Sequence, residues 1–359
     1  MSPDRQKQQL QAGRSPFPLV DLVKVVAAQL IVLHHLAWYG PMSDVAATLA
    51  PFFAEIFAWL ANHARHAVAA FLATAGFLAA QSLQPTGLPL AQSPLRLILR
   101  RYLRLVLPFA VAMLFAIVCA SLARQWMTHA SIGSPPGIAQ VMAHLALVHG
   151  LLGYESLSAG VWYVAIDFQL YSLLVLLIWL SGKLSCRLAS ADFLRMFMLA
   201  LLACASLFYF NRDAGWDSTA LYFFGAYALG VAGAWLLRSP VPIRWVVLMT
   251  VLVGLALLID FRPRIAIALL VALGLITAHL SGWRGLQLPW LAPMSRSSYA
   301  LFLVHFPFCL LVNAGFQLWM PADPFVNLLG VLLAWLGSNV LAGVFQRQIE
   351  VRLYKTISI

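Results

Sequence analysis

Apolar residues follow one another along this chain in stretches of about 18–25 residues, separated by shorter polar segments. A helix of that length crosses a hydrocarbon layer roughly 30 Å thick, because each residue adds about 1.5 Å. The pattern therefore predicts an all-α polytopic membrane protein, a bundle of about ten transmembrane helices. The predicted spans are 19–39, 66–83, 100–123, 160–181, 193–210, 219–237, 243–260, 263–280, 297–319 and 325–346.

One further apolar stretch, residues 137–152, is too short to be a span and carries His144 and His149. Such a segment is typical of an interfacial or re-entrant helix. We place it within a long outer loop, 124–159, and expect a second outer loop at 40–65.

Basic residues are distributed unevenly between the two sides of this arrangement. With the N-terminus inside, seventeen of the 23 Lys and Arg residues lie in inner segments, and five lie in outer ones. This bias predicts that both termini are cytosolic, since short cytoplasmic loops are enriched in Lys and Arg. We expect a cytosolic tail at 1–18, a membrane domain at 19–346 and a second cytosolic tail at 347–359.

The composition agrees with a membrane protein. Apolar residues make up 62% of the chain and charged residues 10%, against about 25% charged in an ordinary soluble domain. The net charge of +11 would suggest nucleic acid as the partner of a soluble protein. Here the short loops between apolar segments hold the basic residues, so topology explains the charge and no nucleic acid is expected.

The first span contains two ionisable residues, Lys24 and His35, eleven positions apart. Eleven residues make about three helical turns, so both side chains lie on nearly the same face, about 16 Å apart along the axis. Lys24 then lies toward the cytosol, and His35 lies beyond the midplane. A buried ionisable group is a functional candidate by default. Alternatively, Lys24 extends to the inner interface and His35 bonds to a neighbouring helix.

Arg101 and Arg104 lie three positions apart at the cytosolic start of the third span. Their guanidinium groups suit phosphate binding, although a topology anchor is the simpler explanation. Asp167 lies inside the fourth span, close to Tyr171. A carboxylate there needs a partner, and an imidazole on the first span is a reasonable one. A structural hydrogen bond between spans remains the alternative.

Tyr299 and His305 lie six positions apart in the ninth span and therefore on different helix faces. His305 either lines a cavity or packs against a neighbour. His63 and His66 have helical spacing but lie in a predicted loop beside Arg65, so no metal site is expected.

Together these segments resemble the acyltransferase family 3 of integral membrane acyltransferases, over about residues 15–345. Two positions depart from the usual pattern: Lys24 replaces an Arg, and Asp167 replaces a Glu that is one methylene longer. The resemblance rests on four motifs in family order: Lys24 with His35, Arg101 with Arg104, Trp162 with Asp167 and Tyr171, and Ser298 and Tyr299 with His305.

The resemblance implies an enzyme of the bacterial inner membrane that transfers an acyl group from cytosolic acyl-CoA to a carbohydrate hydroxyl. Acetyl-CoA is the expected donor, and the expected acceptor is exopolysaccharide, O-antigen or a similar lipid-linked glycan. Membrane lipid is expected to surround the helices. It further implies that His35 is the catalytic base, that Asp167 orients it, and that Lys24, Arg101 and Arg104 bind the coenzyme. Tyr171, Tyr299 and His305 are further candidates.

Two other functions are compatible with a bundle containing buried charges. One is a transporter or flippase that moves a lipid-linked sugar without making bonds. The other is a membrane scaffold of a polysaccharide-assembly complex. Labelled acetyl-CoA distinguishes the transporter from the enzyme, because a transporter leaves no labelled glycan. The scaffold instead predicts that single changes at His35 are harmless.

Overall fold

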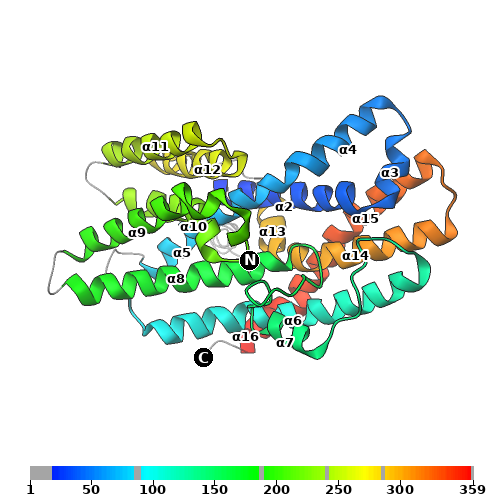
Figure 1. Cartoon of the computed structure of the whole chain (residues 1–359), viewed down its shortest axis with the longest axis horizontal. Coiled ribbons are helices and arrows are strands. Elements are labelled where there is room, and N and C mark those ends of the chain that lie inside the picture. The colour runs from blue at the N-terminus through cyan, green and yellow to red at the C-terminus, as the bar shows by residue number, and fades with distance from the viewer. Residues whose placement is uncertain (1–17, 85–89, 186–189, 239–241, 284–287, 357–359) are drawn as a thin grey trace, which may run out of the picture.

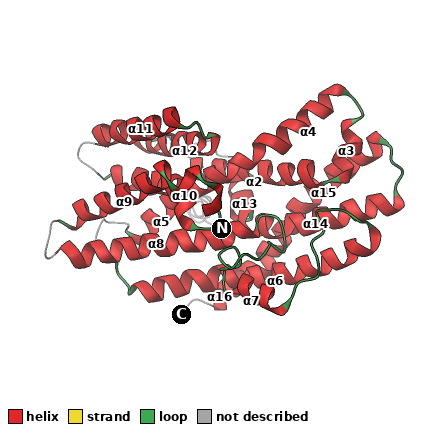
Figure 2. Ribbon diagram, in the orientation of Figure 1, coloured by secondary structure: helices red, strands yellow, loops and turns green. Residues whose placement is uncertain are grey.

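The computed structural model describes residues 18–84, 90–185, 190–238, 242–283 and 288–356. These residues form helices joined by loops and no strands (Figure 2). The predicted tail 1–18 lies outside the described residues except for Pro18, where the first described helix begins.

Each predicted span contains one helix, so the all-helical membrane fold is confirmed. Nine helical segments among the described residues are long and apolar enough to cross a membrane, and α10, which is also apolar, has 17 residues. The ten helices are α2 (Pro18–Tyr39), α5 (Val68–Leu83), α6 (Pro94–Trp126), α8 (Val161–Ser185), α9 (Ala191–Phe208), α10 (Ala220–Leu236), α11 (Pro242–Ile259), α12 (Pro263–Leu280), α14 (Ser298–Trp319) and α15 (Pro324–Phe345).

The expected loop at 40–65 is mostly helical, and that part of the sequence-based prediction is wrong. It contains α3 (Pro41–Ala47), α4 (Pro51–His63) and the start of η1 (Ala64–Ala67), which leads directly into α5. Pro41 and Pro51 begin the two helices, where a missing backbone N–H costs nothing. Both prolines are therefore helix starts and not loop residues.

The remaining short elements are α7 (Ile138–Leu145), η2 (Phe210–Arg212), η3 (Ala214–Trp216) and α13 (Leu291–Arg296). As expected, α7 is a short helix within the apolar stretch 137–152. After α15 the chain continues through a π-helical segment, η4 (Gln346–Glu350), into α16 (Val351–Thr356), so the predicted C-terminal tail is helical as far as residue 356.

Two apolar cores hold the bundle together. One is built mainly from α5, α8, α9, α10 and α12, and the other mainly from α2, α6, α14 and α15. In Figure 1, α8 and α9 extend toward one end of the molecule and α14 and α15 toward the other, while α6 runs past both groups. On α11 only Val253 and Ala256 are buried, so most of this apolar helix forms outer surface suited to lipid.

Within the first core, α5 and α10 approach so closely that their backbones touch. A Cβ atom on Gly230 would lie only 1.8 Å from the Ala73 carbonyl oxygen. Helices in membranes associate through such small residues, because lipid provides no hydrophobic force to drive them together. This contact fixes α10 against α5, and both helices supply residues to the cavity described next.

Candidate functional site: a cavity with a histidine pair

A cavity of about 780 Å³ lies where the two cores meet. Its lining includes Leu72 of the first core and Phe302 of the second. Loop residues from the segments α6–α8 and α9–α10 and the first turn of α12 line it, and we call this end of the bundle the loop face. The sequence predicts the loop face to be the outer side. The volume lies within the range of roughly 300–1,000 Å³ that is usual for small-molecule sites.

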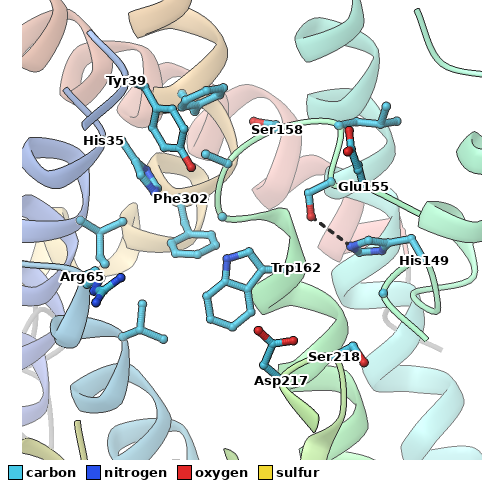
Figure 3. A pocket seen from close by; sticks show the side chains of 18 of the residues that line it. His35, Tyr39, Arg65, His149, Glu155, Ser158, Trp162, Asp217, Ser218 and Phe302 are labelled. Carbon is cyan, nitrogen blue, oxygen red and sulfur yellow. Dashed lines mark hydrogen bonds between the residues drawn. The ribbon is translucent and has the colours of Figure 1, made fainter. Parts of the chain in front are cut away.

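His35 of α2 lines this cavity and is paired with His305 of α14. Its Nδ1 lies 2.7 Å from His305 Nε2, and the two ring planes are 6° from parallel. His305 is fully buried, and its Nδ1 lies 2.7 Å from the Leu301 carbonyl oxygen. Figure 3 shows His35 beside Tyr39 and Phe302 at the cavity.

These contacts assign the tautomers of both rings. A carbonyl oxygen only accepts hydrogen bonds, so His305 Nδ1 carries a proton and donates it to Leu301. With both rings neutral, His305 Nε2 is then an acceptor, and His35 Nδ1–H must donate to it. The lone pair of His35 is therefore on Nε2. Among the described residues, no side chain or backbone group occupies that atom.

The chain leaves space beside His35 by placing a glycine there. Gly160 has φ +92°, and a Cβ atom on it would lie 3.2 Å from two atoms of the Phe302 ring and 3.8 Å from His35 Cε1. Residues with side chains rarely adopt that backbone conformation. The glycine both permits the turn into α8 and keeps the approach to the imidazole open.

Trp162, two residues further on, provides an aromatic surface inside the cavity. Its indole stacks on the Phe223 ring with centroids 5.3 Å apart, and Figure 3 shows it at the centre of the site. Amphipathic aromatic rings of this kind offer a flat apolar surface with a polar N–H edge. The sequence indicated Trp162 only as part of a motif and gave it no role of its own.

Asp167 does not contact His35, and the predicted pair between them is not formed. Asp167 is bound instead to Arg101 of α6, with 2.5 Å between Arg101 Nη2 and Asp167 Oδ2. Asp167 follows Trp162 by five residues on α8, about 7.5 Å along the axis and away from the loop face. The side chain that contacts His35 is His305.

The remaining predicted residues lie at the opposite end of the bundle from the cavity mouth, around the Arg101–Asp167 pair. The Arg101 guanidinium lies 5.1 Å from the centre of the Tyr171 ring, so these motif residues do meet. Arg104 is exposed and lies over the Tyr354 ring at 5.0 Å.

Two further motif residues tie helices together at this end. Lys24 donates from Nζ to the Ser295 carbonyl oxygen at 2.8 Å, and Ser295 Oγ in turn donates to Asp21. Tyr299 donates from its hydroxyl to the Leu105 carbonyl oxygen at 3.0 Å. Both contacts join neighbouring elements: Lys24 joins α2 to α13, and Tyr299 joins α14 to α6.

A second pair of histidines lies on the loop face. The His144 and His149 rings stack with centroids 3.9 Å apart. His144 Nε2 accepts a hydrogen bond from the Leu157 amide at 3.2 Å, while its Nδ1 donates to the Gln140 carbonyl oxygen at 2.8 Å. Burial lowers the pKa of His144, and burial together with the neighbouring ring lowers that of His149 to about 4. Both rings are therefore neutral near pH 7.

The profile of the acyltransferase domain family, acyltransferase 3, matches residues 17–344, which is nearly the whole chain. The protein belongs to this family. No curated protein and no solved structure matches it significantly. The family resemblance carried by the four motifs is thus confirmed over the membrane domain.

For this acyltransferase-family protein, the sequence identified His35 as a candidate, but it did not identify several other residues that line the cavity. Arg65, His149 and Arg264 all line the cavity, although the sequence analysis assigned no role to any of them. The signal that could have found them is their shared position at the predicted outer side, together with Trp162. Within the described residues no cluster of potential metal ligands occurs.

Proposed function

We propose that this protein transfers an acyl group, acetyl in the simplest case, from acyl-CoA to a hydroxyl group of a carbohydrate. It would do so as a multi-pass protein of the bacterial inner membrane, with the donor on the cytosolic side and the acceptor in the cavity at the loop face. The observation that carries the proposal is the free Nε2 of His35, held by His305 and facing a cavity large enough for a sugar ring.

In the proposed reaction the acceptor hydroxyl attacks the thioester carbonyl carbon. His35 Nε2 removes the hydroxyl proton as the new C–O bond forms. The tetrahedral intermediate then breaks its C–S bond, and the coenzyme thiolate takes the proton back from His35. The products are the acylated carbohydrate and free coenzyme A. His305 remains hydrogen-bonded to Leu301 throughout and stabilises the His35 imidazolium while it exists.

The donor end of the bundle has the charge that a coenzyme requires. Acyl-CoA is polyanionic, and a guanidinium offers phosphate a planar set of donors. Arg104 is exposed and forms no ion pair among the described residues, whereas Asp167 already neutralises Arg101. We therefore assign the main phosphate contact to Arg104. Only the uncharged acyl arm has to approach His35, since phosphates would pay a large desolvation penalty in the bundle.

The test uses membranes that contain the wild-type protein or its His35→Ala variant, with labelled acetyl-CoA supplied on the cytosolic side. General-base catalysis contributes about 10²- to 10⁴-fold, so labelled glycan should fall by that factor at normal protein level. His63→Gln is the matched control, because His63 bonds to the Trp59 carbonyl oxygen of its own helix and does not line the cavity. Unchanged labelling in His35→Ala membranes would refute the mechanism, and absence of label in wild-type glycan would favour a transporter.

A second variant separates the donor from the acceptor. Arg104→Gln should raise the KM for acyl-CoA with little change in the KM for the acceptor, because Arg104 lies far from the cavity lining. Loss of one charge-assisted contact corresponds to about 1.5–3 kcal/mol, or about 10- to 150-fold. An increase confined to the acceptor KM would contradict the docking role.

A further inference from the structure

One wall of the cavity carries basic side chains that lack a counter-charge. Arg65 and His66 come from η1, and Arg264 comes from the first turn of α12. Arg65 forms no hydrogen bond or ion pair with any described residue. Arg264 uses Nη2 to donate to the Asn211 carbonyl oxygen at 3.0 Å and lies over the Tyr222 ring, while its Nε is buried without a partner.

The carboxylates of the loop face do not neutralise this wall. Asp260 pairs with Arg212 and Arg262, at 3.6 and 3.5 Å. Glu155 also lines the cavity, but Figure 3 shows it on the other side of Trp162 from Arg65. Asp217 lines the cavity without forming an ion pair to Arg65 or Arg264 among the described residues.

Arg65 is exposed and Arg264 is partly buried, and both are positively charged side chains that line the same cavity, so they repel each other across it. Arg65 and Arg264 each lie within electrostatic range of His66. Arg264 also lies at the N-terminus of α12, where the helix dipole adds positive potential. An anion in the cavity removes this repulsion, and guanidinium groups bind carboxylate or phosphate oxygens with directed hydrogen bonds.

The same cavity has two more unsatisfied polar atoms, His149 Nδ1 and Ser158 Oγ, in side chains that are 1% and 4% exposed. Buried polar atoms without a partner are rare in folded proteins. A ligand rich in hydroxyl groups, or the water it carries, supplies partners for them once it enters.

We infer that the acceptor is an anionic carbohydrate, whose carboxylate or phosphate is bound at Arg65 and Arg264 while a nearby hydroxyl lies at His35. This inference rests on the proposed acyl transfer and names the class of acceptor at that same site. Trp162, between the basic wall and the polar wall, provides the face on which the sugar ring packs. Arg65 is the residue that selects for the anion, because its side chain has no structural partner to give up.

The experiment uses the purified full-length protein in detergent, with labelled acetyl-CoA and three soluble probes. Methyl glucoside is the neutral probe, methyl glucuronide carries a carboxylate, and glucose 1-phosphate carries a phosphate. Both binding and acetyl transfer are measured for the wild type, Arg65→Gln, Arg65→Glu and Arg212→Gln. Arg212→Gln is the control, because it removes an equal charge from the loop face. The Arg212 side chain is 49% exposed and does not line the cavity.

The wild type should bind and acetylate at least one anionic probe about tenfold better than the neutral one, the effect of roughly one charge-assisted hydrogen bond. Arg65→Gln should remove that preference, Arg65→Glu should reverse it, and Arg212→Gln should preserve it. Equal use of neutral and anionic probes, a preference that survives Arg65→Gln, or failure of wild type to bind either anion would overturn the inference. Transfer that survives His35→Ala would instead overturn the proposed function, so the two failures are distinguishable. A preference for the carboxylate over the phosphate identifies a uronic acid, and the reverse identifies a sugar phosphate.

Discussion

Replacing His305 tests the tautomer assignment more directly than replacing the base itself. His305 does not line the cavity, so its variants alter His35 without touching the acceptor. In His305→Phe the aromatic volume is nearly preserved, but His35 Nδ1–H loses its acceptor at 2.7 Å. The tautomer with a lone pair on Nε2 is then no longer favoured, and the ring can hold its proton on the reactive nitrogen.

The size of the effect follows from the hydrogen bond. A buried donor left without a partner costs about 1–3 kcal/mol. At about 1.4 kcal/mol per factor of ten, the reactive tautomer of His35 should fall about 5- to 140-fold. We expect kcat to fall by that factor and the KM for acyl-CoA to stay the same, because Lys24 and Arg104 are unchanged.

The assay is steady-state acetyl transfer by purified protein, with thermal stability measured in parallel. His305→Gln is the informative companion, since its amide offers an oxygen acceptor to His35 and an N–H donor to Leu301. It should recover most of the activity lost in His305→Phe. Wild-type kcat in His305→Phe would refute the reasoning, as would equal losses in the two variants at equal stability, because a packing role alone would then explain them.

Three other changes have defined outcomes. Asp167→Ala leaves the Arg101 side chain, which is 33% exposed, without its ion-pair partner and should lower stability by about 1–3 kcal/mol, measured by denaturation in detergent; no measurable loss would contradict this. Gly160→Ala should cost about 1–3 kcal/mol through its positive φ and also lower kcat, because its methyl group enters the space beside the catalytic imidazole. Burial lowers the pKa of His144, so its contribution to stability is complete above about pH 6.5 and is lost as pH falls toward the lowered value. Hydrogen exchange at the Leu157 amide, corrected for intrinsic rate, should therefore increase over that range, and constant protection would exclude the effect.

The sequence was sufficient to predict the helices but not their partners. A membrane span needs only length and local composition, because the bilayer requires every backbone group to be bonded within the helix. That is why all ten predicted spans contain a helix. The segment 40–65 was predicted wrongly because proline is as common at a helix start as in a loop, and the sequence does not show which applies at Pro41 and Pro51.

Side-chain pairing across helices depends on the rotation and axial offset of each helix, and spacing along one helix fixes neither. The eleven-residue spacing of Lys24 and His35 predicted only that the two side chains lie on nearly the same face of one helix. It did not show whether the partner would come from α8 or α14. An aspartate and a histidine were equally reasonable partners on chemical grounds, and the helix positions bring His305 to the imidazole.

The resulting separation of charge has a consequence for the chemistry. In the proposed reaction, a carboxylate against His35 would stabilise the imidazolium as it forms, but it would also place a negative charge where we infer that an anionic acceptor binds. With His305 as its partner, His35 belongs to a pair that stays neutral until the proposed proton transfer. Asp167 instead neutralises Arg101 deeper in the bundle, where an unpaired guanidinium would be expensive. A neutral imidazole pair at the cavity and a closed ion pair beneath it therefore suit the anionic acceptor that we infer, because neither puts an unpaired carboxylate in contact with His35.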